Sequence, residues 1–102
     1  MIPKILHQVY NMSGREPELR PDYAAYRQSW IRHHPDWEYR YWDHQSARAL
    51  IASKYQFFLS TYDSYPYFIQ RCDAVRYFIL HHSGGLYVDM DPWESYFFAV
   101  AA

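Results

Sequence analysis

Two aspartates, Asp89 and Asp91, form an Asp-x-Asp pair directly after a short apolar run. If that run is a strand, alternate residues point to the same side, so both carboxylates face one way, roughly 6.5–7 Å apart along the chain. Two like charges at that separation repel each other unless a proton or a cation lies between them. Carboxylate oxygens suit hard divalent ions such as Mg²⁺ or Mn²⁺, and phosphate oxygens fill the positions that two carboxylates leave open. The pair therefore predicts a metal–diphosphate site.

A second charged pair, Asp73 and Arg76, lies in the segment that precedes the aspartates. The two residues are three positions apart, so a helix would place them on one face. The segment is otherwise strongly apolar, and an unpaired charge in it would be costly. The spacing leaves two interpretations open. The pair is either an internal ion pair with a structural role or a polar pair at the rim of the same pocket, in contact with a ligand.

The segment from Pro66 to Asp91 predicts a helix, a glycine stop and a short buried strand. Pro66 suits the first turn of a helix, and apolar residues follow it at helical spacing. Gly84 and Gly85 predict the stop, because glycine adopts the left-handed conformation without a steric penalty. The apolar positions of the predicted helix are Ile69, Cys72, Val75, Phe78 and Ile79. The strand residues predicted to point into a core, away from the aspartates, are Leu86, Val88 and Met90.

The rest of the chain alternates predicted strands and helices. They are a strand over 4–10, a helix capped by Asp22 that stops before Pro35, a strand over 38–42, a helix capped by Asp43 and a helical segment over 55–62. This order predicts an α/β fold with a mainly parallel sheet. Ligands of such sheets bind beyond the carboxyl ends of the strands. The three predicted ends are Val9-Tyr10, Trp42-Asp43 and Asp89–Asp91.

The whole chain sets further limits. Its 102 residues make one domain at most, and the net charge of −1 gives no indication of a nucleic-acid partner. The single cysteine, Cys72, excludes an internal disulfide framework. We expect no membrane span in this chain, because no apolar run is long enough, and no signal peptide at its start.

Three segments of the chain together resemble a known family. They read Ile-Pro-Lys-Ile-Leu-His-Gln at 2–8, Arg-Cys-Asp-Ala-Val-Arg-Tyr at 71–77 and Gly-Gly-Leu-Tyr-Val-Asp-Met-Asp at 84–91. In this combination they resemble the DXD-containing sugar-transferase family of the GT-A fold. Within it, Tyr65-Pro66-Tyr67, Gln70-Arg71 and residues 77–82 are most similar to the fungal mannosyltransferases that act on inositol phosphoceramide.

The resemblance implies a GT-A (Rossmann-like) nucleotide-sugar-binding half and a retaining transferase. The transferase would move a hexose, here mannose from GDP-mannose, to a glycolipid or glycan acceptor such as inositol phosphoceramide. It would use a divalent metal, Mn²⁺ or Mg²⁺. By matching position, the catalytic metal and the donor diphosphate would be held by Asp89 and Asp91, the donor sugar and phosphate by Asp73 and Arg76, and the nucleotide base by Val9 and Tyr10.

The resemblance also implies a cellular setting. It places full-length relatives on Golgi or other secretory-pathway membranes, in sphingolipid or glycan biosynthesis, with a regulatory subunit as a further partner. The chain departs from the family pattern after Asp91, where the family continues with strands and helices that carry the acceptor site. We therefore expect a truncated copy, with residues 1–91 as the N-terminal nucleotide-sugar-binding part of a glycosyltransferase domain and 92–102 as a divergent tail.

Two interpretations from other classes stay open. A phosphatase of the haloacid dehalogenase type also carries its nucleophile in Asp-x-Asp after an apolar strand. That motif usually opens the domain and has Thr or Val where this chain has Trp93. The other alternative is an inactive fragment that binds the donor without turnover. Nucleotide-sugar turnover would separate the fragment from the transferase, and cleavage of a simple phosphate ester would favour the hydrolase.

Overall fold

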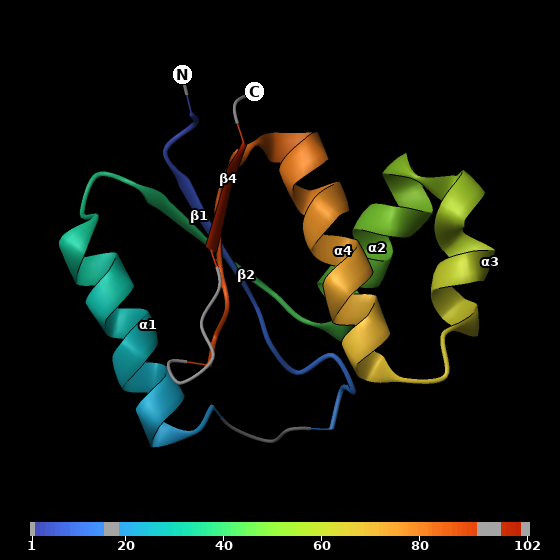
Figure 1. Cartoon of the computed structure of the whole chain (residues 1–102), viewed down its shortest axis with the longest axis horizontal. Coiled ribbons are helices and arrows are strands. Elements are labelled where there is room, and N and C mark those ends of the chain that lie inside the picture. The colour runs from blue at the N-terminus through green and yellow to red at the C-terminus, as the bar shows by residue number, and fades with distance from the viewer. Residues whose placement is uncertain (1, 16–18, 92–96, 101–102) are drawn as a thin grey trace.

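The computed structural model describes residues 2–15, 19–91 and 97–100, and its architecture is α/β (Figure 1). The elements follow one another in the predicted alternation of strands and helices. In chain order they are β1 (Ile5–Val9), α1 (Pro21–His33), β2 (Glu38–Trp42), α2 (His44–Lys54), α3 (Gln56–Ser64), α4 (Phe68–Ser83), β3 (Gly85–Val88) and β4 (Phe97–Val100).

The strands form one sheet in the order β2-β1-β3-β4. The strand β1 lies parallel to both neighbours, with Leu6 opposite Tyr39 on β2 and Leu86 on β3. The carboxyl ends of these three strands therefore meet at one edge of the sheet, as the sequence predicts. The strand β4 was not predicted. It pairs antiparallel with β3, so part of the predicted divergent tail forms an edge strand, while residues 92–96 and 101–102 lie outside the described residues.

The helices lie on both sides of the sheet, with α1 on one side and α2, α3 and α4 on the other (Figure 1). The main core lies on the side of the three helices, where apolar residues of α2 and α4 pack against β1 and β3. The helix α1 has no buried residue. The buried residues of the main core are Val9, Met12, Ala47, Leu50, Ile51, Tyr55, Tyr62, Val75, Ile79, Leu80 and Tyr87.

Local sequence signals decide where α2 begins but not where α1 begins. Asp43 is the N-cap of α2, as predicted, because its carboxylate accepts a hydrogen bond of 3.0 Å from the Ser46 N–H. Hydrogen bonds from the backbone N–H and the side chain of Ser46 lower the pKa of the Asp43 carboxyl. The prediction that Asp22 is the N-cap of α1 is wrong. Arg20 occupies the cap position, Pro21 opens the helix, and the Asp22 carboxylate instead accepts a hydrogen bond of 3.0 Å from Arg20.

The boundaries of α4 confirm one prediction and correct another. Pro66 is not in the first turn, because Tyr67 is extended and serves as the N-cap. The helix ends at Gly84 as predicted, and Gly84 and Gly85 both have positive φ, at 66° and 105°. A Cβ on Gly85 would lie 2.5 Å from the Ile5 carbonyl oxygen, so this residue also lets β3 approach β1 closely. The turn therefore requires glycine for its conformation and for space.

The strand β3 is buried on both faces rather than on one. Val88 and the following Met90 are buried, as predicted, but Leu86 is only half-buried. Tyr87, which alternates with them, is buried in the main core. A central strand covered on both sides is expected to read as a continuous apolar run. Ile69, predicted among the apolar positions of α4, is 65% exposed, because it lies on the first turn beyond the main core.

Candidate functional site

The carboxyl edge of the sheet holds a cavity of about 550 Å³ that gathers every site residue predicted from the sequence. Its walls come from the end of β1, the start of α1, the first half of α4 and the segment after β3. The lining residues are Val9, Tyr10, Tyr23, Ile69, Cys72, Asp73, Arg76, Tyr87, Asp89, Met90 and Asp91. A smaller cavity of about 230 Å³ shares Val9, Tyr10, Ile69 and Cys72 with it and continues towards Asn11.

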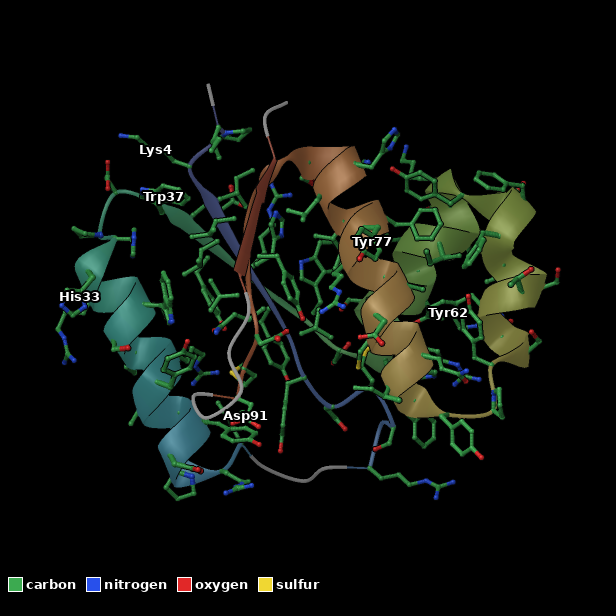
Figure 2. The ribbon with its side chains drawn as sticks, viewed as in Figure 1. Lys4, His33, Trp37, Tyr62, Tyr77 and Asp91 are labelled. Carbon is green, nitrogen blue, oxygen red and sulfur yellow. The ribbon has the colours of Figure 1, made fainter. Side chains whose placement is uncertain are left out.

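Asp89 and Asp91 follow the strand rather than forming its last part. The strand β3 ends at Val88, and its pairing with β1 ends at Tyr87 opposite His7. The strict alternation that the sequence predicted therefore does not extend to the aspartates. Both nevertheless line the same cavity. Figure 2 shows Asp91 at the lower edge of the sheet, on the side nearer α1 than α4.

Arg76 links the two predicted acidic positions. Its Nη2 atom lies 3.2 Å from Oδ1 of Asp73, and its Nη1 atom lies 3.9 Å from Oδ1 of Asp89. The Arg76 side chain is 18% exposed, whereas that of Asp73 is 55% exposed. The first interpretation is therefore only half right, because the ion pair exists but its acid is at the surface. Both residues line the cavity, so they are placed for the second interpretation as well.

The buried side chain of Tyr87 contacts two of these charged residues, Arg76 and Asp89. The Arg76 guanidinium carbon lies 6.0 Å from the centroid of the Tyr87 ring, within the range of cation–π attraction. Burial, and then the negative charge of Asp89, raise the pKa of Tyr87, and its hydroxyl is hydrogen-bonded to Asp89. Tyr87 and Arg76 thus hold the Asp89 carboxylate from two elements.

A second chain of contacts holds the backbone of the Asp-x-Asp segment. The side-chain amide of Gln8, which is fully buried, donates to the Asp89 carbonyl oxygen at 3.4 Å. The Tyr39 hydroxyl donates to the carbonyl oxygen of the same amide at 2.9 Å. The central strand β1 and the edge strand β2 therefore both hold the first aspartate in place. Sequence reasoning did not identify Gln8, although a buried amide in a strand must find hydrogen-bond partners.

Sequence reasoning also did not identify Tyr23 of α1, which lines the cavity and contacts Tyr10. The two rings meet edge to face, with centroids 5.9 Å apart and an interplanar angle of 83°. Burial, and then the charge of Asp91, raise the pKa of Tyr23. The position of Tyr23 in the predicted helix could have indicated its place in the site. The helix that follows a parallel strand starts at the carboxyl edge of the sheet, so its first turn lies at the ligand edge.

The single cysteine, Cys72, lies on the wall of the cavity between α4 and the end of β1. Burial raises the pKa of its thiol to about 11. At neutral pH the group is therefore a protonated, weakly reactive side chain, in agreement with its predicted place at an apolar position of α4.

The donor set at this edge fits a divalent cation in its chemistry. Asp89 and Asp91 offer carboxylate oxygens, which suit Mg²⁺ and Mn²⁺. In the part of the chain that the structure describes, no three His, Cys, Asp or Glu side chains gather into a metal-binding group. A cation held here would therefore complete its coordination with oxygens of a ligand and of water.

Comparison with known proteins agrees with this geometry. Residues 21–94 match the family model described as "Glycosyltransferase sugar-binding region containing DXD motif". The chain belongs to this glycosyltransferase family. The family match favours the transferase over the haloacid dehalogenase alternative. The matched region contains α1, α4 and the Asp-x-Asp segment, three of the four elements that supply the cavity wall, whereas the end of β1 lies outside it. No solved structure shows a significant match to the chain.

Several curated relatives are similar over most of the chain. Inositol phosphoceramide mannosyltransferase 3 of Schizosaccharomyces pombe is 47% identical over 90 residues, 88% of this chain and 24% of the relative. Mannosyl phosphorylinositol ceramide synthase SUR1 of Saccharomyces cerevisiae is 41% identical over 91 residues, 89% of this chain and 23% of the relative. An uncharacterized glycosyltransferase of Acanthamoeba polyphaga mimivirus is 30% identical over 92 residues, 89% of this chain and 36% of the relative. The chain thus spans about a quarter of the length of its fungal relatives.

Within the described residues, none of the helices has the length and apolar character needed to cross a membrane.

Proposed function

We propose that this chain binds a nucleoside diphosphate sugar as the donor-binding part of a glycosyltransferase. One observation carries the proposal. A single cavity at the carboxyl edge of the sheet brings two ligand-type carboxylates, an Asp–Arg pair and the aromatic residue that follows β1 within reach of one extended ligand. In this proposal the donor-binding part is residues 1–91, the division of the chain that its sequence predicts.

Each part of the donor has a counterpart in the cavity. The carboxylates of Asp89 and Asp91 would hold the divalent metal, which would supply positive charge for the donor diphosphate. Asp73, with an exposed carboxylate at the rim, and Arg76, with donors that reach inward, contact the donor sugar and its phosphate. Val9 and Tyr10, at the end of β1, pack against the nucleotide base, as in ligand binding beyond the carboxyl ends of parallel strands.

The bound metal, Mn²⁺ or Mg²⁺, would act as a Lewis acid that neutralises the charge developing on the departing diphosphate. The residues of the chain prepare the site for it. Arg76, held over Tyr87, fixes the Asp89 carboxylate from the side of α4, and Gln8 fixes the backbone of the same residue. Positioning of this kind accounts for a large part of enzymatic rate enhancement. These are contacts between different helices and strands, so the site depends on the folded sheet.

The finer assignment follows the names of the relatives. Two of them are named for mannose transfer to inositol phosphoceramide or for the synthesis of mannosyl phosphorylinositol ceramide. We therefore assign mannose transfer to inositol phosphoceramide, in sphingolipid biosynthesis, as the activity. The family resemblance of the sequence adds GDP-mannose as the donor, a Golgi membrane as the setting, retention of anomeric configuration and a regulatory subunit as partner. For this chain the alternative remains a donor-binding part that does not turn over on its own.

Calorimetry with GDP tests the donor site. We expect GDP binding that requires Mn²⁺ or Mg²⁺ and is lost when the metal is chelated. GDP affinity that is independent of the metal, or no binding by the folded chain, would contradict the proposal. Mannose transfer from GDP-mannose to inositol phosphoceramide then separates a transferase from a chain that only binds the donor. Release of phosphate from a simple ester would instead support the hydrolase.

A further inference from the structure

We propose that Tyr23, on the first turns of α1, is a donor-binding residue whose ring forms the wall against which the nucleoside of the donor packs. The inference rests on the proposed function and extends it to a helix that the sequence did not associate with the site. It assigns α1 a direct part in recognition of the nucleoside, the portion of the donor that the carboxylates do not hold.

The rings of Tyr10 and Tyr23 form a corner. Tyr10 follows β1 and Tyr23 belongs to α1, and their nearly perpendicular rings, at 83°, line the same cavity. A flat aromatic ligand that stacks on one ring would meet the other at its edge, an arrangement that aromatic groups favour. Neither residue is fully exposed, so the corner is partly formed before a ligand enters.

Arg20 holds the second ring of the corner in place. Its guanidinium carbon lies 4.6 Å from the centroid of the Tyr23 ring, and its Nη2 atom lies 3.0 Å from the Asp22 carboxylate. The helix has no side-chain hydrogen bond at its N-cap, and the arginine at that position instead contacts the Tyr23 ring on the first turn. The Tyr23 side chain is therefore positioned for a ligand in the cavity rather than for the core, since α1 buries no residue.

The order of groups across the cavity indicates which part of the donor reaches this corner. Asp73 and Arg76 belong to α4, on one side of the sheet, whereas Tyr23 belongs to α1, on the other (Figure 1). Asp89 and Asp91 lie between these two walls, because Asp89 is near Arg76 of α4 and Asp91 lies on the side nearer α1 (Figure 2). A diphosphate bound at the aspartates therefore has its sugar towards α4 and its nucleoside towards α1.

The test compares two ligands that share the diphosphate but differ in the nucleoside. Calorimetry in saturating Mn²⁺ measures the affinity of GDP and of inorganic pyrophosphate for the folded chain. We expect Tyr23→Leu to weaken GDP about tenfold, since it removes an aromatic stacking surface, and to leave pyrophosphate affinity within about twofold. Tyr23→Phe keeps the ring and should bind GDP within about threefold of the wild type. The matched control is Tyr26→Leu, because the Tyr26 ring packs on Trp30 beside a separate cavity.

The outcomes separate the inference from the function on which it rests. If the wild type binds neither ligand with metal, the proposed function is wrong, and the inference is wrong with it. If the wild type binds both and Tyr23→Leu changes neither affinity, only the inference fails. Equal losses for GDP and pyrophosphate would also overturn it, because Tyr23 would then act through Asp91 as a positioning residue.

A second variant covers the case in which Tyr23→Leu does not fold. Tyr23→Trp places an indole in the corner, and its emission, taken as the difference from the wild type, reports on contact. GDP should quench that emission, whereas pyrophosphate should leave it nearly unchanged. Identical responses to the two ligands would contradict a nucleoside contact.

Discussion

The guanidinium of Arg76 lies 3.9 Å from the carboxylate of Asp89, across the boundary between α4 and the segment after β3. The Arg76 side chain is mostly buried, and its charge offsets part of the repulsion between Asp89 and Asp91 before any cation binds. The same guanidinium pairs with Asp73 within the helix. One arginine therefore connects the proposed sugar contact with the proposed metal ligands.

The metal assignment predicts that the aspartates are needed for binding and not for folding. Asp89→Ala or Asp91→Ala should abolish Mn²⁺-dependent GDP binding, because each change removes a ligand and a negative charge. Titration calorimetry on variants with a native thermal midpoint measures this. Asp36→Ala is the matched control, since the exposed Asp36 carboxylate pairs with Lys4 at the surface, away from the cavity. Unchanged metal-dependent affinity in the site variants would refute the assignment.

The proposed contact between Asp73 and the donor sugar predicts that a substitution of Asp73 lowers the affinity only for a ligand that carries the sugar. Asp73→Asn should weaken GDP-mannose several-fold and leave GDP nearly unchanged, because only the first ligand carries the sugar. The thermal midpoint should change little, since the Asp73 carboxylate is 55% exposed and Arg76 keeps its contact with Asp89. Asp63→Asn is the control, as its carboxylate pairs with Arg48 at the surface. A large fall in the thermal midpoint would show that the role of Asp73 is structural.

The fully buried His7 predicts a dependence of stability on pH. The Trp42 Nε1–H can only donate, so His7 Nδ1 accepts at 3.1 Å and His7 Nε2–H donates to the Gly84 carbonyl oxygen at 2.9 Å. The neutral imidazole is thus satisfied at both nitrogens. Burial lowers the pKa of His7 below its ordinary value of 6.5. The unfolded chain therefore binds the proton at a higher pH than the folded chain does.

It follows that the His7 contribution to the free energy of unfolding is complete above pH 6.5 and decreases as the pH falls from there towards the lowered folded pKa. Urea unfolding of the wild type and of His7→Gln between about pH 7.5 and 5 measures the difference. The variant should be less stable at the upper end and should lose less stability on acidification. Parallel pH profiles for the two proteins would contradict this linkage.

The single thiol offers an independent reporter of the cavity. Because burial raises the pKa of Cys72 to about 11, alkylation should be slow at neutral pH and should accelerate as the pH rises. Since Cys72 lines the cavity, saturating GDP with Mn²⁺ should slow it further. Mass spectrometry follows the labelling, with Cys72→Ser as the blank. A labelling rate that GDP and Mn²⁺ leave unchanged would place the ligand away from this wall.

The sequence by itself determined most of the local structure. The cap at Asp43, the stop at Gly84 and the strand over Glu38–Trp42 depend on nearest neighbours along the chain, so residue types and spacing predict them. Two local predictions were wrong, the N-cap at Asp22 and the place of Pro66 in a first helical turn. Both concern a helix start near a proline, where a start shifted along the chain satisfies the same residue preferences. The candidate site residues at the ends of β1 and β3 could be predicted because parallel strands carry their carboxyl ends to one edge, whereas the third predicted end, Trp42-Asp43, does not line the cavity.

Only the tertiary structure decided which side chains meet at that edge. The corner of Tyr10 and Tyr23 depends on where α1 crosses the sheet, and the approach of Arg76 to Asp89 depends on how α4 packs against β3. The antiparallel pairing of β4 also joins segments that no local pattern relates. Such contacts arise from burial and packing between elements that are distant along the chain, and these forces set distances that spacing along a helix or strand does not encode.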